Sequence, residues 1–247
     1  MLRAPSLARN SLDQTGQASI AQAYAYNWSG YAQSAEGATF YAVTDTWTVP
    51  TVDTSLPGIQ FSSDWVGIGG FSDQTLVQAG TQADNIDGLA YYNAWTEILP
   101  ASERSLALAI HPGDTVTATV QQNFPGIWRM TVQDDTAKTK AVRIAFYGGS
   151  SHASVEAIHE RPTVLGGLAT LAKTPNVTFD PGEYSTAYKG TPSYTPLLSA
   201  AAGATVNQVF MVNNTGTEVI AAPSLPDADN DGFSVAFGSA SPPPPGS

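Results

Sequence analysis

The chain has 247 residues, of which 42% are hydrophobic and 13% are charged, and its formal charge is −11. This length can bury one large hydrophobic core, and the acidic balance argues against binding to nucleic acid, which requires a basic surface. Because the chain has no cysteine, disulfide bonds, zinc–thiolate sites and a thiol nucleophile are excluded.

The composition divides the chain into a leader, one domain and a tail. Residues 1–23 are rich in Ala, Gln and Ser and show no strand pattern, so we interpret them as a flexible leader or the remnant of a pro-segment. Residues 24–238 form the predicted domain, and the Pro-rich residues 239–247 are interpreted as a tail or linker stub. Neither an apolar secretory segment at the start nor a long apolar run is visible, so no membrane span is predicted.

The domain has the pattern of short strands separated by turns. Apolar and polar residues alternate with a period of two, and Gly, Pro, Asn and Asp interrupt the runs. The predicted strands, in chain order, are residues 39–49, 89–99, 115–121, 127–132, 141–147, 206–212 and 233–237. Long helical patterns are absent, and the best helix candidate is the stretch 165–171. Many short strands with regular turns predict an all-β sandwich or barrel.

Glu156 is the first candidate for chemistry. In the strand-like run 153–160, Val155 and Ala157 belong to a mostly apolar face that is predicted to point to the core. Glu156 lies in the middle of the opposite, largely polar face, with Glu160 two side chains along. A solvated sheet face explains this pattern without any function, whereas a catalytic role requires a concave face and a partner.

Gln78 is the candidate partner. Leu76, Gln78 and Gly80 share one face of their predicted strand, and Gly80 would allow the close approach of a peptide backbone. A glutamine on a strand is commonly solvated or bonded to a neighbour, so Gln78 carries information only beside Glu156. Together, the carboxylate can take a proton from water and the amide N–H can stabilise the oxyanion that forms. Such a pair hydrolyses a substrate without serine, cysteine or metal.

Three further groups give weaker signals. Trp28 and Trp65 lie in polar, Gly-rich surroundings, which suit the wall of a groove better than the middle of a strand. His152 follows two serines, but the Gly-x-Ser-x-Gly elbow of a serine hydrolase is missing. The acidic stretch 227–232 matches the opening half of a calcium loop, yet the position that requires an acid is Gly238. A tight turn is therefore favoured, and no metal or cofactor is predicted.

Seven motifs, in order from about residue 26 to 160, resemble the glutamic peptidases called eqolisins. In this chain they are Asn27-Trp28-Ser29-Gly30-Tyr31, Trp47-Thr48-Val49-Pro50, Trp65-Val66-Gly67-Ile68-Gly69-Gly70, Leu76-Val77-Gln78-Ala79-Gly80-Thr81, Tyr92-Asn93-Ala94-Trp95-Thr96-Glu97, Pro112-Gly113-Asp114 and Val155-Glu156-Ala157-Ile158-His159-Glu160. By this resemblance, Gln78 stands at the position of the catalytic glutamine and Glu156 at that of the catalytic glutamate.

The resemblance implies an antiparallel, concanavalin-like or lectin-like sandwich of two stacked, bent sheets with the active site on a concave face. It also implies protein or peptide substrates, secretion, an acidic optimum, metal independence and insensitivity to pepstatin; we expect a monomer. Trp28 and Trp65 are expected to line the substrate groove together with Thr96, and Glu97 is expected as an acid behind the catalytic pair.

Three departures from the family pattern stand near the expected site. Thr96 replaces a tyrosine that lines the site in the family, Ala157 replaces a tryptophan beside the catalytic Glu, and Gly69 replaces an acid. The two changes from bulky to small residues are expected to widen the groove or to remove support for the pair.

The favoured hypothesis is an acid endopeptidase in which Glu156 is the general base and acid. An ordinary glutamate has a pKa of about 4.3, so Glu156 would be ionised in moderately acidic solution without special tuning. A glycoside hydrolase using Glu97 and Glu156 is one alternative, and it needs carboxylates about 5–5.5 Å or roughly 6.5–9.5 Å apart. A carbohydrate-binding or peptide-binding sandwich that has lost catalysis is the other.

Overall fold

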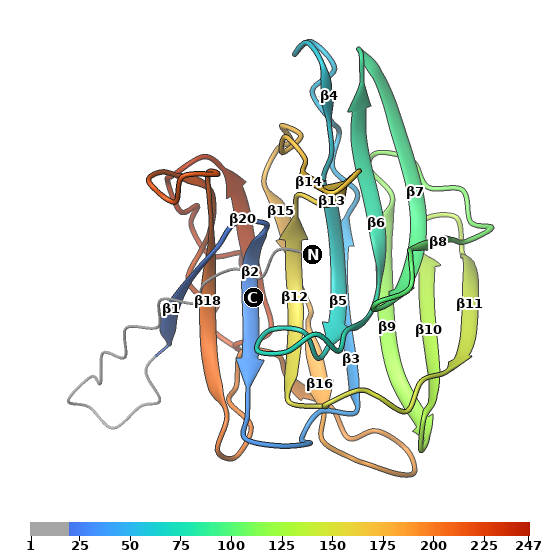
Figure 1. The fold of residues 1–247 in the computed structure, drawn as a ribbon. Helices are drawn as coiled ribbons and strands as arrows, with labels where there is room; N and C mark the ends of the chain where they lie inside the picture. The colour runs from blue at the N-terminus through green and yellow to red at the C-terminus, as the bar shows by residue number, and fades with distance from the viewer. Residues whose placement is uncertain (1–19) are drawn as a thin grey trace.

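The structure is a computed structural model that describes residues 20–247. The regular structure of this part of the chain consists of β-strands stacked in two layers (Figure 1), which confirms the predicted all-β sandwich. Within these residues no helix could cross a membrane. Residues 1–19, most of the predicted leader, lie outside the described residues, and strand β1 already begins at Ala21.

The front sheet in Figure 1 carries the candidate site. Its strands, in spatial order, are β1 (Ala21–Ala25), β18 (Thr205–Val212), β2 (Trp28–Ser34), β12 (Ser154–Glu160), β5 (Ser63–Ile68), β6 (Val77–Ile86), β7 (Leu89–Ile98) and β8 (Arg104–Ser105), with β4 (Ile59–Gln60) at the end of β6. All of these pairs are antiparallel except β1 with β18, which is parallel.

The back sheet covers the inner face of the front sheet. Its strands, in spatial order, are β19 (Val219–Pro223), β20 (Phe233–Phe237), β15 (Val177–Phe179), β3 (Ala42–Thr48), β9 (Thr115–Phe124), β10 (Ile127–Asp134) and β11 (Thr139–Phe146). Strand β16 (Glu183–Ser185) also pairs with β3, and β17 (Thr195–Pro196) pairs with β16. Because β18 pairs with both β2 and β19, it joins the two sheets along one side.

The seven strands predicted from alternation are all present, with shifts of a few residues at their ends. The predicted helix at 165–171 is wrong. Strands β13 (Thr163–Val164) and β14 (Gly167–Leu168) form a hairpin there, and its turn residues Leu165 and Gly166 have φ of 51° and 83°. Two consecutive left-handed residues match the twist of a two-residue hairpin and end any helix.

The core between the sheets is built from the alternating apolar residues of both layers. Val66, Ala79, Val155 and Ala157 of the front sheet belong to the same buried cluster as Trp47 of the back sheet. The period of two that places Val155 and Ala157 inside places Glu156 on the outward face of the same sheet. The predicted orientation of this strand is therefore confirmed.

A buried ion pair lies at the centre of the front sheet. His159 of β12 and Asp64 of β5 face each other in register, with 2.7 Å between His159 Nδ1 and Asp64 Oδ1, and both side chains are buried. A slip of one residue between β12 and β5 would move one partner to the opposite face and leave the other without its counterpart. The pair therefore specifies the register that aligns the neighbouring site residues.

Two glycines allow the front sheet to bend across the site. A Cβ atom at Gly30 would overlap the carbonyl oxygen of Ala157, and a Cβ atom at Gly80 would overlap that of Asp64. Glycine at such positions lets adjacent strands approach closely and the sheet curve. The close approach predicted for Gly80 is thus made by the neighbouring strand β5, and the space beside Gly80 is already filled.

Candidate active site

The two candidate residues lie in one row across the front sheet. Glu156 of β12 and Gln78 of β6 are both direct partners of Gly67 in β5, the strand between them. Residues that face each other across strands project from the same face of a sheet, so both side chains extend outward. The register thus brings together two residues that are 78 positions apart in the chain (156 − 78).

Gly67 separates the pair without placing a side chain between them. Two strand spacings of about 4.8 Å put the backbones of β12 and β6 roughly 10 Å apart, which two long side chains can span. A Cβ atom at Gly67 would lie 2.8 Å from Leu76 Cδ1 and 2.9 Å from Trp65 Cζ3. A larger residue there would require the Leu76 or Trp65 side chain to shift. The importance of Gly67 could not be predicted from the sequence, because only the register shows which residues flank it.

Glu97 extends the same row and holds the Gln78 amide. It is the direct partner of Gln78 on β7, and Gln78 Nε2 donates a hydrogen bond of 2.5 Å to Glu97 Oε2. The amide oxygen of Gln78 is buried and has no partner among the described residues. Glu97 therefore orients the amide and leaves its oxygen and its second N–H for other contacts.

Glu156 is fully buried, and neither of its carboxyl oxygens has a hydrogen-bond partner among residues 20–247. Burial raises the pKa of Glu156 well above its usual value; the nearby Ser154 hydroxyl and Phe71 N–H, which lie outside hydrogen-bond geometry, lower it in part, and the charge of Asp73 adds to the rise. In this conformation the side chain is a neutral carboxylic acid in moderately acidic solution. The expectation of an ordinary pKa is therefore wrong, because composition could not reveal how completely the carboxyl group is desolvated.

An apolar cluster surrounds the pair on the outward face. It consists of Trp65, Leu76, Trp95, Leu99 and Ile158, with Trp28 packed against it. The rings of Trp28 and Trp65 meet edge to face at a centroid distance of 5.0 Å. Both tryptophans therefore lie beside the site, but they are strand residues, and Trp65 is fully buried rather than an open wall. Their polar sequence neighbours point to other faces of the strands. The polar surroundings in the sequence therefore did not indicate that these tryptophans are strand residues.

Glu160 lies at the edge of this cluster. Trp65 Nε1 donates a hydrogen bond of 2.7 Å to Glu160 Oε2, and Asn27 Nδ2 donates one of 3.0 Å to Oε1. Burial and, to a smaller extent, the charge of Glu97 together raise the pKa of Glu160 to about 7 despite these donors. The pKa of Glu97 is also raised by burial. The outward face thus holds three carboxyl groups, those of Glu97, Glu156 and Glu160, that keep their protons to higher pH than ordinary glutamates do.

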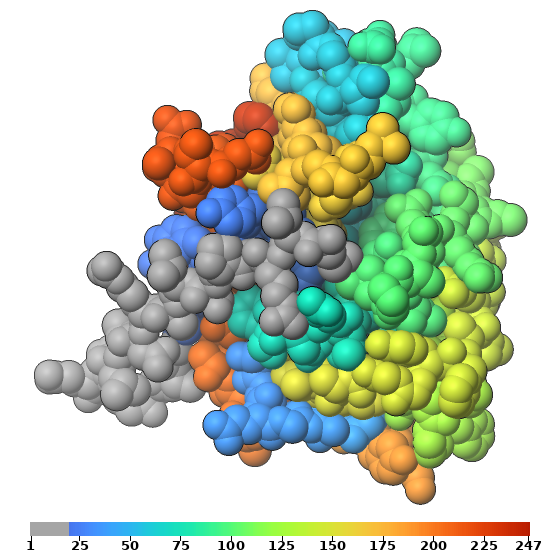
Figure 2. All heavy atoms as spheres, viewed as in Figure 1, coloured from blue at the N-terminus to red at the C-terminus, as the bar shows by residue number. Residues whose placement is uncertain are grey.

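The connection between β5 and β6, residues 69–76, covers the row. In Figure 1 it crosses in front of β12 and reaches β2, and Figure 2 shows its atoms at the surface of this face. Phe71 packs against a small apolar cluster that includes Ala32, the direct partner of Glu156 on β2. Thr75 anchors the other end, because its Oγ1 lies 3.1 Å from Ser151 Oγ and accepts a hydrogen bond from Ser151 N. Residue composition gave no sign of this cover.

Thr96 and Ala157 lie on the inner face of the sheet, and the structure does not bring them to the row of Glu156. Ala157, Val66, Ala79 and Thr96 form one row of direct partners that faces the core. Thr96 is fully buried, and Arg143 Nη1 lies 3.2 Å from its Oγ1. The two departures from the family pattern thus fall in the same layer of the core, away from the face that carries Glu156. The expected widening of a groove on that face does not follow from these positions, whereas a loss of support for the pair stays a prediction.

Gly69 begins the covering connection with a φ of 82°, and a Cβ atom there would overlap the carbonyl oxygen of Thr75. The acid that stands here in the family pattern would therefore force this connection to move.

His152, the candidate for a serine triad, has a structural role. Its ring stacks on Trp128 at 5.1 Å, and its Nδ1 lies 2.9 Å from the carbonyl oxygen of Phe40.

Comparison with known proteins identifies the relatives of this architecture. The model of the peptidase A4 family matches residues 26–224. A search of curated proteins found no match.

Solved structures share the fold. A scytalido-glutamic peptidase with a transition-state analogue inhibitor is 19% identical, with 86% of this chain and 98% of that chain covered and a TM-score of 0.71. SCP-B, an eqolisin in complex with the tripeptide Ala-Ile-His, is 19% identical over 86% and 98% of the two chains, with a TM-score of 0.65. Aspergilloglutamic peptidase from Aspergillus niger is 21% identical over 72% and 99%, with a TM-score of 0.61.

The buried carboxyl groups make stability depend on pH. Asp84 and Glu160 have pKa values raised to about 7 by burial, and burial raises those of Asp45 and Glu156 well above normal. Between the ordinary carboxyl pKa and pH 7 the folded state binds more protons than the unfolded state, so stability falls as pH rises. Asp53, whose pKa is lowered by hydrogen bonds from Ser55, opposes this trend only below about pH 4.

We therefore predict that the unfolding midpoint, measured by scanning calorimetry, falls by at least about 5 °C between pH 4.5 and pH 7.5, since 1 kcal/mol corresponds to roughly 2–4 °C for a domain of this size. Glu160→Gln should reduce this difference, because it removes one of the carboxyl groups responsible. The exposed Glu218→Gln serves as a control that leaves the difference unchanged. A midpoint that rises with pH over this interval would contradict the analysis.

Proposed function

The chain belongs to the peptidase A4 family and is a glutamic-type peptidase, and from this premise we propose that Glu156 and Gln78 carry out its hydrolysis of peptide bonds. The observation that supports the proposal best is the row in which both residues flank Gly67 on one face of the sheet. We further propose that the protein acts on protein and peptide chains, whereas secretion and a monomeric state stay predictions.

Glu156 would act first as a base and then as an acid. Its carboxylate takes a proton from a water molecule, and the oxygen of that water forms a bond to the carbonyl carbon of the peptide. The carbonyl oxygen becomes an oxyanion, which the free N–H of the Gln78 amide stabilises. Protonated Glu156 then gives its proton to the amide nitrogen, and the C–N bond breaks to release an acid and an amine.

Glu97 would act as a positioning residue. The hydrogen bond that Glu97 accepts from Gln78 Nε2 fixes the orientation of the amide, so that its nitrogen faces Glu97. The second N–H of that nitrogen is then available for the oxyanion, while the unpartnered Gln78 Oε1 can accept a hydrogen bond from the attacking water. A donor held in place before the reaction stabilises the oxyanion without reorganisation during the chemical step.

Access to the pair requires the cover to move. Glu156 is fully buried and Gln78 is 3% exposed, so no peptide can reach them in this conformation. We propose that displacement of residues 69–76 admits the substrate and rehydrates Glu156. Because burial is the main cause of its raised pKa, rehydration lowers that pKa and allows Glu156 to become the base in acidic solution.

The geometry gives no support to a glycoside hydrolase. Glu97 and Glu156 belong to strands that are separated by β5 and β6, which places their backbones about 14 Å apart. Glycosidase pairs need carboxyl groups within roughly 5–9.5 Å, and here Gln78 stands between the two acids and occupies Glu97 Oε2.

The first test is hydrolysis of a denatured protein or a quenched fluorescent peptide in the presence of pepstatin, with wild type, Glu156→Gln and Gln78→Ala. Glu156→Gln should lower kcat more strongly than Gln78→Ala and leave only a residual rate, because a carboxamide cannot take up the proton of water. Gln78→Ala should lower kcat by roughly 10²–10³-fold, the usual cost of one lost oxyanion donor. The exposed Glu218→Gln is the matched control and should cleave normally. Cleavage by Glu156→Gln at the rate of wild type would refute the mechanism.

The second test concerns the cover. Phe71→Ala removes the ring that packs against the apolar cluster containing Ala32, so the connection over Glu156 should loosen and the pKa of Glu156 should fall. Since the base must be deprotonated, the acid limb of the kcat/KM–pH profile should move to lower pH. Phe124→Ala, at a residue that is 68% exposed, should leave the profile in place. An unchanged or raised acid limb in Phe71→Ala would contradict the proposed opening.

A further inference from the structure

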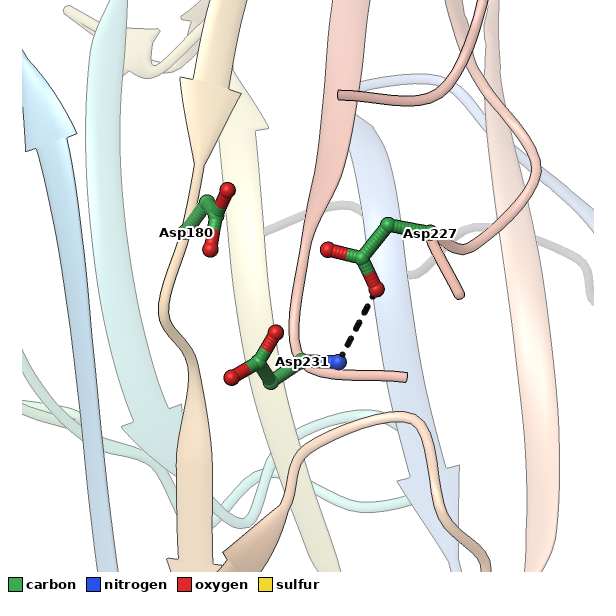
Figure 3. Close-up of side chains that lie close together, drawn as sticks. All are labelled: Asp180, Asp227 and Asp231. Carbon is green, nitrogen blue, oxygen red and sulfur yellow. Dashed lines mark hydrogen bonds between the residues drawn. The ribbon is translucent and has the colours of Figure 1, made fainter. Parts of the chain in front are cut away.

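A second group of carboxylates lies on connections between strands of the back sheet, apart from the active site. Asp180 follows strand β15, whereas Asp227 and Asp231 belong to the connection before β20, and Figure 3 shows the three side chains converging. One oxygen of each lies within 4.8 Å of the corresponding oxygens of the other two. The sequence of 227–232 matches only the opening half of a calcium loop, and on that ground a tight turn without a metal was expected. The position of Asp180 beside this stretch depends on the fold and is not visible in the sequence.

Two buried carboxylate oxygens have no hydrogen-bond partner among the described residues: one belongs to Asp227 of this group and the other to Asp45 of β3. Asp227 is 7% exposed, and its Oδ2 has no hydrogen bond among the described residues, while its Oδ1 accepts one of 3.2 Å from Asp231 N. Asp45 of β3 is fully buried; its Oδ1 accepts a bond of 2.7 Å from Thr46 N, but its Oδ2 has no partner. An unpaired buried carboxylate oxygen is costly, so both oxygens point to a missing positive ligand.

Two glycines keep these oxygens close together. A Cβ atom at Gly232 would overlap Asp227 Oδ2 and lie 2.9 Å from Asp180 Cγ. A Cβ atom at Gly182 would overlap Asp45 Oδ2 and lie 3.2 Å from the carbonyl oxygen of Asp231. Both glycines therefore border the carboxylates, and the absence of their side chains lets the backbone and the acids approach one another.

Among residues 20–247, no basic side chain forms a salt bridge with these carboxylates. The salt bridges formed by residues 20–247 join His111 to Asp114, His159 to Asp64 and Lys173 to Asp53. None of them includes a carboxylate of the group. Buried charges in proteins are normally paired or coordinate a metal ion.

We propose that Asp180, Asp227 and Asp231 bind one calcium ion at neutral pH, with the carboxylate of Asp45 beneath it. Calcium takes oxygen ligands at about 2.3–2.6 Å, so two oxygens on one ion lie at most about 5 Å apart, which the separation within 4.8 Å satisfies. An all-carboxylate set favours calcium over zinc, which prefers nitrogen and sulfur ligands. Magnesium demands a near-ideal octahedron and keeps most of its waters, so it is expected to bind less tightly.

The ion would tie together three segments of the back sheet. Asp45 belongs to β3, Asp180 to the turn after β15, and Asp227 and Asp231 to the connection that leads into β20. Because β15 lies between β3 and β20, neutralising the four acids would stabilise this part of the sandwich. Its role is structural, and it requires no change in the chemistry proposed for Glu156.

Isothermal titration of the full chain with CaCl2 at pH 7 tests the site directly, after removal of bound metal with a chelator. We expect saturable binding of one calcium per chain, weaker binding of MgCl2, and an unfolding midpoint that rises by several degrees in millimolar calcium. Asp227→Asn should weaken calcium binding at least tenfold, and Asp180→Asn provides a second variant should the first fail to fold. Asp87→Asn, at an exposed turn residue, is the matched control and should bind like wild type.

Absence of saturable calcium binding by folded wild type would overturn the proposal. Binding that is unchanged in folded Asp227→Asn or Asp180→Asn would overturn it as well, because the ion would then sit elsewhere. These measurements are independent of peptidase activity, so their outcome does not depend on the catalytic proposal.

Discussion

The site depends on the register of β5 between β12 and β6. This register makes Gly67 the common neighbour of Glu156 and Gln78, so the two functional groups share one face. The buried pair of His159 and Asp64 specifies the alignment, since a slip of one residue would separate it. The apolar alternation that fills the core therefore also directs a carboxyl group and a carboxamide outward at the same level.

Burial away from water sets the pKa of the carboxyl groups in this row. An apolar cluster and the connection 69–76 lie around Glu156, and its burial raises the pKa of its carboxyl group well above the usual value; under the proposed mechanism this group becomes a base when water reaches it. The same burial makes other acids, such as Asp84 and Glu160, hold their protons to about pH 7. A fold that tolerates neutral buried carboxyl groups in acid but not their charges at neutral pH suits a peptidase that works in acid.

The sequence predicted the strands and the shared outward face of Gln78 and Glu156, whereas their catalytic role stays a prediction. Alternation identifies which side of β12 faces the core, and the ordered motifs single out Gln78 and Glu156. Neither reveals pairing between strands, so the central place of Gly67, the inward position of Thr96 and the burial of Trp65 could not be foreseen. The raised pKa of Glu156 and the meeting of Asp180 with Asp227 likewise arise from segments far apart in the chain.

A double-mutant cycle measures most directly whether Glu156 and Gln78 act as one unit. The kcat/KM values of wild type, Gln78→Ala, Glu156→Gln and the double variant are compared on one peptide substrate, with folding checked by circular dichroism. Residues that serve a single step lose their effects non-additively, so the double variant should be no slower than Glu156→Gln alone. If the two losses multiply instead, the residues act independently, and the shared mechanism proposed for this row of the sheet would be contradicted.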